Sequence, residues 1–300
     1  MSPRQEQPDR TPGARERAPA GARDRLGDEP VVATTSAERY VMSGGRAARL
    51  AIKEGDLFLY TNELGQVPGT ENSALGLYYR DTRYLSRYEL TIAGRQPVLL
   101  SAGAGRGYAA TVELTNLEAR TADGHVLPQA TLHVRRTRFL SDRLYELLRV
   151  RNYHHREVEL VLDLHFDADF ADLFEVRGSR RRRRGSRLAP KVDDVSLTLS
   201  YLGLDDVTRQ TVVRFHDRPE SLKQGRARFR LRLPAGERAF IRYDIQVIGP
   251  GAPGEAGGEF NERIGALRHE HESWESEATG VYTDNELVNR VLRRGQEDLR

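Results

Sequence analysis

The sequence predicts a mainly β protein, an antiparallel sandwich or barrel that is followed by helices. Apolar and polar residues alternate with a period of two from about residue 46 to residue 248, as in strands that bury one face. Turn-forming residues separate these runs at short intervals, which favours antiparallel strands over a parallel sheet with crossover helices. After the Gly- and Pro-rich stretch 249–258, apolar residues recur with the period of a helix instead.

The first 36 residues differ in composition from the rest. They are rich in Pro, Gly, Ala, Arg and acidic residues, and their large apolar side chains are almost limited to Leu26, Val31 and Val32. Such a segment buries too little apolar surface to offset the entropy that it loses on ordering. We therefore expect a disordered tail over residues 1–36 and a β domain over residues 37–249.

The clearest strand is expected over Glu157–Phe170, where the even-numbered positions are apolar from Val158 onward. The opposite face of this strand carries polar and charged side chains, including Asp163 and His165. The same alternation predicts strands over 195–201, 227–233 and 239–247. Turn signals lie between the predicted strands: Ala93-Gly94, Asp123-Gly124, Leu202-Gly203 and Pro234-Ala235-Gly236.

Two helices are expected after the β domain. Residues 250–282 predict a hinge and a linker helix, with apolar positions on one helical face: Phe260, Ile264, Leu267, His271 and Trp274.

In the last segment, Thr283-Asp284-Asn285-Glu286 has the form of a capping box, with Thr283 as the expected N-cap. An apolar stripe follows this box: Leu287, Val288, Val291, Leu292 and Leu299. No Gly, Asn or Pro then closes the helix before Arg300. We expect residues 283–300 to be the truncated first helix of a further helical domain, which is missing from this chain or supplied by another molecule.

Composition excludes several classes of protein. No apolar run approaches the ~20 residues that cross a bilayer, and the N-terminus lacks a signal-peptide core. The absence of cysteine excludes disulfides and thiolate zinc sites, and it fits a cytoplasmic location. Lys+Arg 47 against Asp+Glu 44 is nearly balanced, so the net charge of +3 does not predict binding to nucleic acid.

An acidic segment follows the clearest predicted strand, over Phe166–Gly178. Dense carboxylates can bind a cation, act as an acid/base pair or hydrogen-bond sugar hydroxyls. The favoured interpretation is that arginines from neighbouring strands pair with them, because the chain is rich in Arg. The acids of this segment are Asp167, Asp169, Asp172 and Glu175.

The cluster Arg80-Asp81-Thr82-Arg83 is the second polar candidate. Asp81 between two arginines predicts ion pairs that fix a loop, and a sugar-facing Arg–Asp pair is the alternative. The run Arg180–Arg184 is expected to form a mobile loop, because five like charges repel one another. Contact with RNA is disfavoured, since no aromatic residues lie between these arginines.

No catalytic, metal-binding or cofactor-binding residue is assigned from spacing. His154-His155 lacks metal-ligand spacing, and His269 and His271 point to different sides of a helix. The chain also lacks the phosphate-loop, zinc-protease, hydrolase and dinucleotide-binding motifs.

Several segments together resemble the N-terminal domain of a bacterial family of glycogen-debranching, amylo-α-1,6-glucosidase-like proteins. The resemblance covers residues 55–300, and its most specific part is Phe166–Gly178. The other segments that carry it are Gly55–Phe58, Gly76–Ser86, Leu132–Arg136 and Leu148–Asn152.

This resemblance implies a β-supersandwich of the mutarotase type ahead of an (α/α) barrel. The barrel would carry the two carboxylates that hydrolyse α-1,6-glucosidic bonds, one protonating the leaving oxygen and the other activating water. Neither carboxylate corresponds to a residue of this sequence. The tail and the arginine run depart from the family pattern, and neither is expected to be essential.

The leading hypothesis is therefore a non-catalytic domain that supports a helical barrel, in cis or in trans, and contacts an α-glucan. A free-standing carbohydrate-binding module is the alternative, followed by a mutarotase-like enzyme and an RNA-binding protein. Tyr78, Tyr79 and Tyr84 are expected to stack on sugar rings. The candidates for contact with glucan or with the barrel are Arg80, Asp81, Arg83, Asp167, Asp169, Asp172 and Glu175.

Overall fold

The computed structural model describes residues 49–70, 73–120, 124–254 and 258–299. The predicted tail, residues 1–36, lies outside the described residues. The described part holds three larger sheets and a two-stranded ribbon, β9 (Ala119–Arg120) with β10 (Val126–Leu127).

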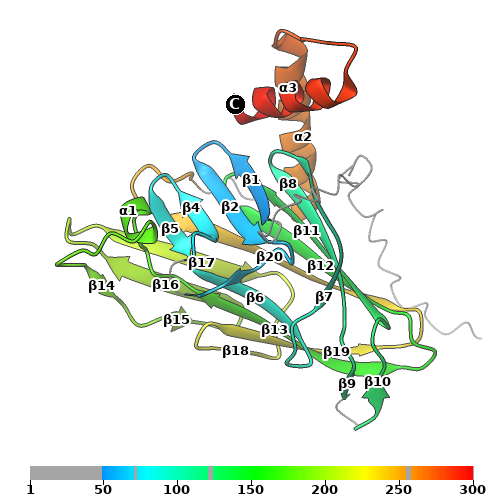
Figure 1. The fold of residues 1–300 in the computed structure, drawn as a ribbon. Coiled ribbons are helices and arrows are strands. Elements are labelled where there is room, and N and C mark those ends of the chain that lie inside the picture. The colour runs from blue at the N-terminus through cyan, green and yellow to red at the C-terminus, as the bar shows by residue number, and fades with distance from the viewer. Residues whose placement is uncertain (1–48, 71–72, 121–123, 255–257, 300) are drawn as a thin grey trace, which may run out of the picture. The chain divides into compact units, whose positions relative to one another are not determined.

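The largest sheet has nine strands, in the order β14-β16-β17-β20-β12-β11-β8-β7, with β15 paired to β16 (Figure 1). Its strands are β7 (Val98–Arg106), β8 (Ala109–Thr115), β11 (Leu132–Leu140), β12 (Leu144–Asn152), β14 (Ser186–Arg187), β15 (Lys191–Val192), β16 (Ser196–Leu202), β17 (Thr208–Phe215) and β20 (Arg238–Ile248).

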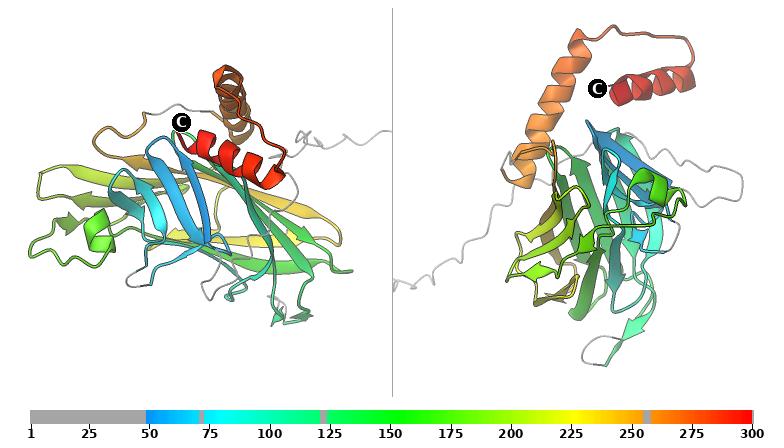
Figure 2. Two further views of the ribbon diagram at one scale, coloured as in Figure 1. Left: turned by 45° about the horizontal axis from the view of Figure 1, so that its top comes forward. Right: turned by 90° about the vertical axis from the view of Figure 1, so that its left-hand side faces the viewer.

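Two smaller sheets form the opposite layer (Figure 1; Figure 2). The five-stranded sheet has the order β18-β19-β13-β6-β3 and the four-stranded sheet the order β1-β2-β4-β5. Their strands are β18 (Ser221–Lys223), β19 (Arg226–Leu233), β13 (Val158–Asp167), β6 (Arg87–Ile92), β3 (Val67–Pro68), β1 (Arg49–Glu54), β2 (Leu57–Asn62), β4 (Gly76–Tyr79) and β5 (Thr82–Leu85).

The predicted fold class, a mainly β antiparallel sandwich, is confirmed. Pairings between the described strands are antiparallel in all sheets. One continuous apolar core joins the layers, with Ile52 from the four-stranded sheet, Leu90 from the five-stranded sheet and Leu148 from the nine-stranded sheet. The inward-facing residues of each strand alternate with more exposed ones, as the period of two predicted.

The clearest predicted strand is shorter than expected. β13 ends at Asp167 instead of Phe170, although Ala168 and Phe170 remain buried. The ladder pairs of β13 stop at Asp167, and Phe170, with a φ of 51°, then turns the chain away from the strand direction. The chain then enters a short helix, α1 (Leu173–Val176), that the sequence did not predict. Alternating burial therefore continued beyond the hydrogen-bonded strand, and the periodicity alone could not mark its end.

A charged cluster is buried between the two layers. The carboxylate of Glu146 accepts a hydrogen bond from Arg136 Nε at 2.6 Å and lies 3.2 Å from Arg138 Nη2. Tyr88 of β6 donates its hydroxyl hydrogen to the same carboxylate, and its oxygen lies 2.7 Å from the hydroxyl of Tyr243. These contacts link the five-stranded sheet to the nine-stranded sheet through polar groups.

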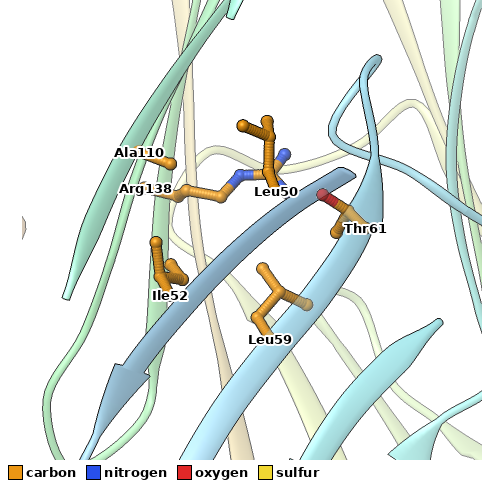
Figure 3. Close-up of a pocket in the computed structure, with 6 residues that line it drawn as sticks. All are labelled: Leu50, Ile52, Leu59, Thr61, Ala110 and Arg138. Carbon is orange, nitrogen blue, oxygen red and sulfur yellow. The ribbon is translucent and has the colours of Figure 1, made fainter. Parts of the chain in front are cut away.

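Arg138 also lines a small pocket between the strand pairs β1–β2 and β8–β11 (Figure 3). Its guanidinium group lies near Leu50 and Thr61 in this view, and Nη1 donates to the carbonyl oxygen of Gly65 at 2.8 Å. The remaining lining residues are apolar: Ile52, Leu59 and Ala110. The pocket is too small for a sugar ring, so it belongs to the packing between the layers.

The predicted linker helix is present as α2 (Phe260–Glu277). Ile264, Leu267 and His271 are buried, as their spacing predicted. Phe260 packs edge-on against Phe139 of β11, with ring centroids 5.0 Å apart. His271 Nε2 lies 2.9 Å from Glu54 Oε2 at the end of β1. The helix is thus held to the sandwich along much of its length.

The last described helix, α3 (Glu286–Leu299), begins later than predicted. Asn285, not Thr283, is the N-cap, since its Oδ1 accepts hydrogen bonds from the backbone N–H groups of Leu287 and Val288. Thr283 instead accepts a hydrogen bond from the Asn285 N–H in the preceding turn. The side chain of Leu299 lies outside the described part. No described helix is long and apolar enough to cross a membrane.

Candidate functional site

The structure brings the two predicted polar clusters together. Thr82 of β5 forms an isolated antiparallel bridge with Asp172. The Arg83 N–H donates to the carbonyl oxygen of Ala171 at 2.9 Å, and the Leu173 N–H donates to that of Asp81 at 2.8 Å. The turn 80–83 therefore lies beside the acidic segment 166–178, and these two segments define the acidic patch.

Arg83 and Asp169 form the central ion pair of the acidic patch. Arg83 is only 8% exposed, and its Nε and Nη2 atoms reach the two carboxylate oxygens of Asp169 at 3.1 and 2.5 Å. Burial opposes the charge of Arg83, but Asp169 outweighs burial and raises the pKa of the guanidinium group. Such a bidentate pair fixes the geometry of both segments.

Asp81 does not take the role that was predicted for it. Arg80 pairs with Asp56 at 3.0 Å and Arg83 with Asp169, so neither arginine uses Asp81 as its carboxylate. The Asp81 backbone carbonyl positions the acidic segment, while its side chain is exposed. The loop is fixed by ion pairs, as expected, but through carboxylates that are distant in sequence.

Helix α1 carries a reciprocal capping box. The Glu175 N–H donates to Asp172 Oδ1 at 2.9 Å, and the Asp172 N–H donates to Glu175 Oε2 at 3.1 Å. Burial alone would raise the pKa of Asp172, but the Glu175 N–H and Arg181 outweigh it and hold this pKa below its ordinary value. Asp172 is therefore a charged structural acid and poorly suited to donate a proton.

Two members of the arginine run pair with the acidic patch, a contact that the prediction of a mobile loop did not include. Arg181 pairs with Asp172, and Arg184 lies 2.8 Å from Glu175 Oε1. The following Arg187 pairs with Asp167. Repulsion among the arginines is offset by these acids, which stand only a few residues earlier in the sequence.

The tyrosines that were expected to stack on sugar rings are buried. Tyr78 packs on Phe58 at a centroid distance of 4.6 Å, and Tyr84 packs against Phe170 at 5.6 Å. Tyr79 donates its hydroxyl hydrogen to the carbonyl oxygen of Gly251. The accessible ring of the acidic patch is instead Phe174 of α1, which is 62% exposed. Sequence reasoning missed it because a four-residue helix has no periodicity to show an outward face.

The chemistry of the acidic patch suits binding. Each carboxylate of the acidic segment has an arginine partner. Paired acids and guanidinium groups beside an exposed ring can hydrogen-bond and stack on a polyhydroxylated ligand. Within the described residues, no group of His, Asp and Glu side chains is arranged to hold a metal ion.

A family model for the N-terminal domain of some glycogen debranching enzymes matches residues 52–244. This match spans more than half of the chain, and the chain belongs to that family of domains. No curated protein sequence matches the chain.

Two solved structures show a similar backbone. One is described as a candidate kojibiose phosphorylase from the human microbiome, with 13% identity and a TM-score of 0.37. That similarity covers 73% of this chain and 28% of the phosphorylase chain. The other is described as a candidate aldose 1-epimerase from Escherichia coli K12, with 8% identity, a TM-score of 0.36, and coverage of 68% of this chain and 100% of that one.

Proposed function

We propose that this chain is the non-catalytic β domain of a glycogen-debranching-type glucosidase. In this role it supports a helical catalytic barrel, in cis or in trans, and contacts the α-glucan substrate. The observation that carries the proposal is the match over residues 52–244 to the family model for the N-terminal domain of some glycogen debranching enzymes. A cytoplasmic location agrees with a cysteine-free chain.

The two C-terminal helices are evidence for the proposed helical partner. Helix α2 is anchored to the sandwich, whereas α3 presents apolar side chains to solvent, with Leu287 65% and Val291 61% exposed. Exposed apolar residues at helical spacing are typical of a surface that another element covers. We propose that helices of the catalytic barrel cover α3, with α2 holding it at a fixed distance from the β domain.

The acidic patch supports contact with glucan. Phe174, Arg80 and Asp81 are exposed and available to a ligand, while Arg83 and Asp169 hold the two segments in place. Asp167, Asp172 and Glu175 are already paired with arginines, so a glucan would hydrogen-bond to these ion pairs. A free-standing carbohydrate-binding module would use the same surface without a barrel.

Calorimetric titration with maltooligosaccharides tests the glucan contact. We expect saturable heat with the 300-residue chain, and affinity that falls about tenfold in Phe174→Ala, because a stacked Phe contributes roughly 1.5 kcal/mol. Tyr282→Ala removes another exposed ring, 84% accessible, and is the matched control. An absence of binding heat, or an equal loss of affinity in both variants, would contradict a glucan contact at the acidic patch.

Incubation with a branched α-glucan tests the non-catalytic role separately. We expect no glucose release from the purified chain, because each carboxylate of the acidic segment is held in an ion pair with an arginine, which suits neither proton donation nor the activation of water. Glucose release that survives repurification would refute this part of the proposal. Binding without hydrolysis agrees with both forms of the proposal, and restored hydrolysis on addition of a barrel domain distinguishes the supporting domain from a free-standing module.

A further inference from the structure

A row of basic side chains crosses the outer face of the nine-stranded sheet, away from the acidic patch. Arg151 of β12 lies directly opposite Arg238 of β20 and opposite His133 of β11. The neighbouring residues of these strands, Val134 and Val150, are buried in the core, so the row points outward. His133, Arg151 and Arg238 define this basic row, which runs across three strands that lie side by side (Figure 1).

The two arginines of the row stack on rings and lack acidic partners in the described part of the chain. Arg151 Cζ lies 4.9 Å from the ring centroid of Tyr153, and Arg238 Cζ lies 5.5 Å from that of Phe240. Arg151 and Arg238 are both exposed. By contrast, most described arginines on other strands have carboxylate partners, as Arg232 has in Glu157 at 2.7 Å.

Glu113, an acid on the strand that follows β11 in this sheet, is already engaged. Glu113 of β8 accepts hydrogen bonds from Arg135 at 2.9 and 2.6 Å, and His133 Nε2 lies 3.7 Å from it. Burial disfavours the protonated form of His133 more strongly than Glu113 favours it, so the pKa of His133 is lowered. The end of the row formed by Arg151 and Arg238 thus keeps an excess of positive charge.

The pairing of Arg151 with Arg238 lowers the stability of the folded chain when no ligand is bound. Like charges directly opposite each other on neighbouring strands repel, and cross-strand partners have Cβ atoms only about 5 Å apart. Stacking on Tyr153 and Phe240 keeps both guanidinium groups at the surface. Because β12 and β20 are antiparallel, Tyr153 and Phe240 lie on opposite sides of the Arg151–Arg238 level. A small dianion between the strands would draw both guanidinium groups off these rings, at a cost of about 0.5–1 kcal/mol each, and would remove the repulsion while using the planar donors of both.

We propose that Arg151 and Arg238 form a binding site for a phosphate monoester or inorganic phosphate. Phosphate oxygens match the forked geometry of guanidinium groups, and one phosphate can bridge two arginines. Tyr153 is 60% exposed beside Arg151 and offers part of its ring to whatever group the phosphate carries. The site is separate from the acidic patch, so its test is independent of glucan binding.

Calorimetric titration of the 300-residue chain with inorganic phosphate and with glucose 6-phosphate, at constant ionic strength set by sodium chloride, tests the site. We expect saturable binding of one phosphate per chain. Arg151→Gln and Arg238→Gln should each weaken it about tenfold or more, because each removes a charge-assisted contact. Tyr153→Ala should weaken glucose 6-phosphate and leave inorganic phosphate unchanged, if the source of the phosphate is a sugar ester.

Arg232→Gln is the matched control, since this arginine is 74% exposed in its side chain and lies on β19. It removes the same charge and should leave binding unchanged. Circular dichroism checks the fold, and Arg151→Lys keeps the charge but loses the fork, so a several-fold loss is expected there. Equal weakening in Arg232→Gln, no saturable binding, or binding of single-stranded RNA but of neither phosphate compound would overturn the proposal.

Discussion

Glu146 is a fully buried carboxylate that lies between two buried guanidinium groups. Burial alone would raise its pKa, but Arg136 and Arg138 outweigh burial and lower it, so the carboxylate stays charged. The hydroxyl groups of Tyr88 and Tyr243 complete the cluster. Sequence alternation places Arg136 on the inward face of β11, yet its charge argued for the surface. The buried ion pair of Arg136 with Glu146, across the β11–β12 hairpin, resolves that conflict.

Glu146→Gln should therefore be among the most destabilising single changes in the β domain. The amide keeps the shape but leaves two buried guanidinium charges uncompensated, which costs about 3–5 kcal/mol. Urea unfolding followed by circular dichroism measures this loss. Glu157→Gln breaks an exposed pair with Arg232 and should change the unfolding free energy by less than about 0.5 kcal/mol. A similar small loss in both variants would show that the buried cluster contributes little.

At the scale of elements, the sequence predicted what depends on local pattern and missed what depends on the path of the chain. The periodic spacing of Ile264, Leu267 and His271 was sufficient to identify α2 and its buried face. The acidic segment and the arginine run were both recognised, but their pairing through Arg181 and Arg184 was not, because it depends on how the chain turns after α1.

The same limit applies to the candidate site. Its two segments were found from composition, whereas their contact requires the bridge between Thr82 and Asp172, which are remote in sequence. Buried and exposed aromatic residues also could not be told apart, so the sequence predicted a sugar contact at Tyr78, which is buried, and none at Phe174, which is exposed. The pairing of distant strands decides which segments meet and which aromatic rings are buried. A local pattern in one sequence does not reveal that pairing.

The attachment of α2 to the sandwich can be tested with Leu267→Ala. This side chain is buried in a cluster with Phe139 and Tyr145, so its truncation should lower the opening free energy of α2 by about 2–5 kcal/mol. Hydrogen exchange of the α2 amides measures this change, while amides of β12 should stay protected. The emission of Trp274, the single tryptophan, reports on the same helix.

Leu287→Ala on α3 is the control, because its side chain is 65% exposed and should contribute little in the chain alone. Unchanged protection of α2 in Leu267→Ala would mean that the apolar cluster does not hold the helix. In that case the polar contacts, His271 with Glu54 and Arg263 with Asp142, would have to be sufficient.

At the scale of the whole molecule, both layers of the sandwich depend on the same interior. Its apolar core is continuous across the three sheets, and the cluster around Glu146 connects β6 with β12 by hydrogen bonds. Among the described residues, the second apolar cluster is the small one that α2 covers on the nine-stranded sheet. On the five-stranded sheet, an arginine and an acid form a cross-strand pair, Arg228 with Asp163. We therefore expect neither layer to stay folded without the other.

We expect the described β strands to unfold in one cooperative transition and α3 to open independently at lower free energy. The shared core couples the sheets, whereas the apolar side chains of α3 that are described, among them Leu287 and Val291, remain largely exposed. Native-state hydrogen exchange at increasing urea measures both. The amides of β6, β12 and β20 should converge on one opening free energy, and those of α3 should exchange well before it. Separate opening energies for β6 and β12 would show instead that the two layers are independent folding units.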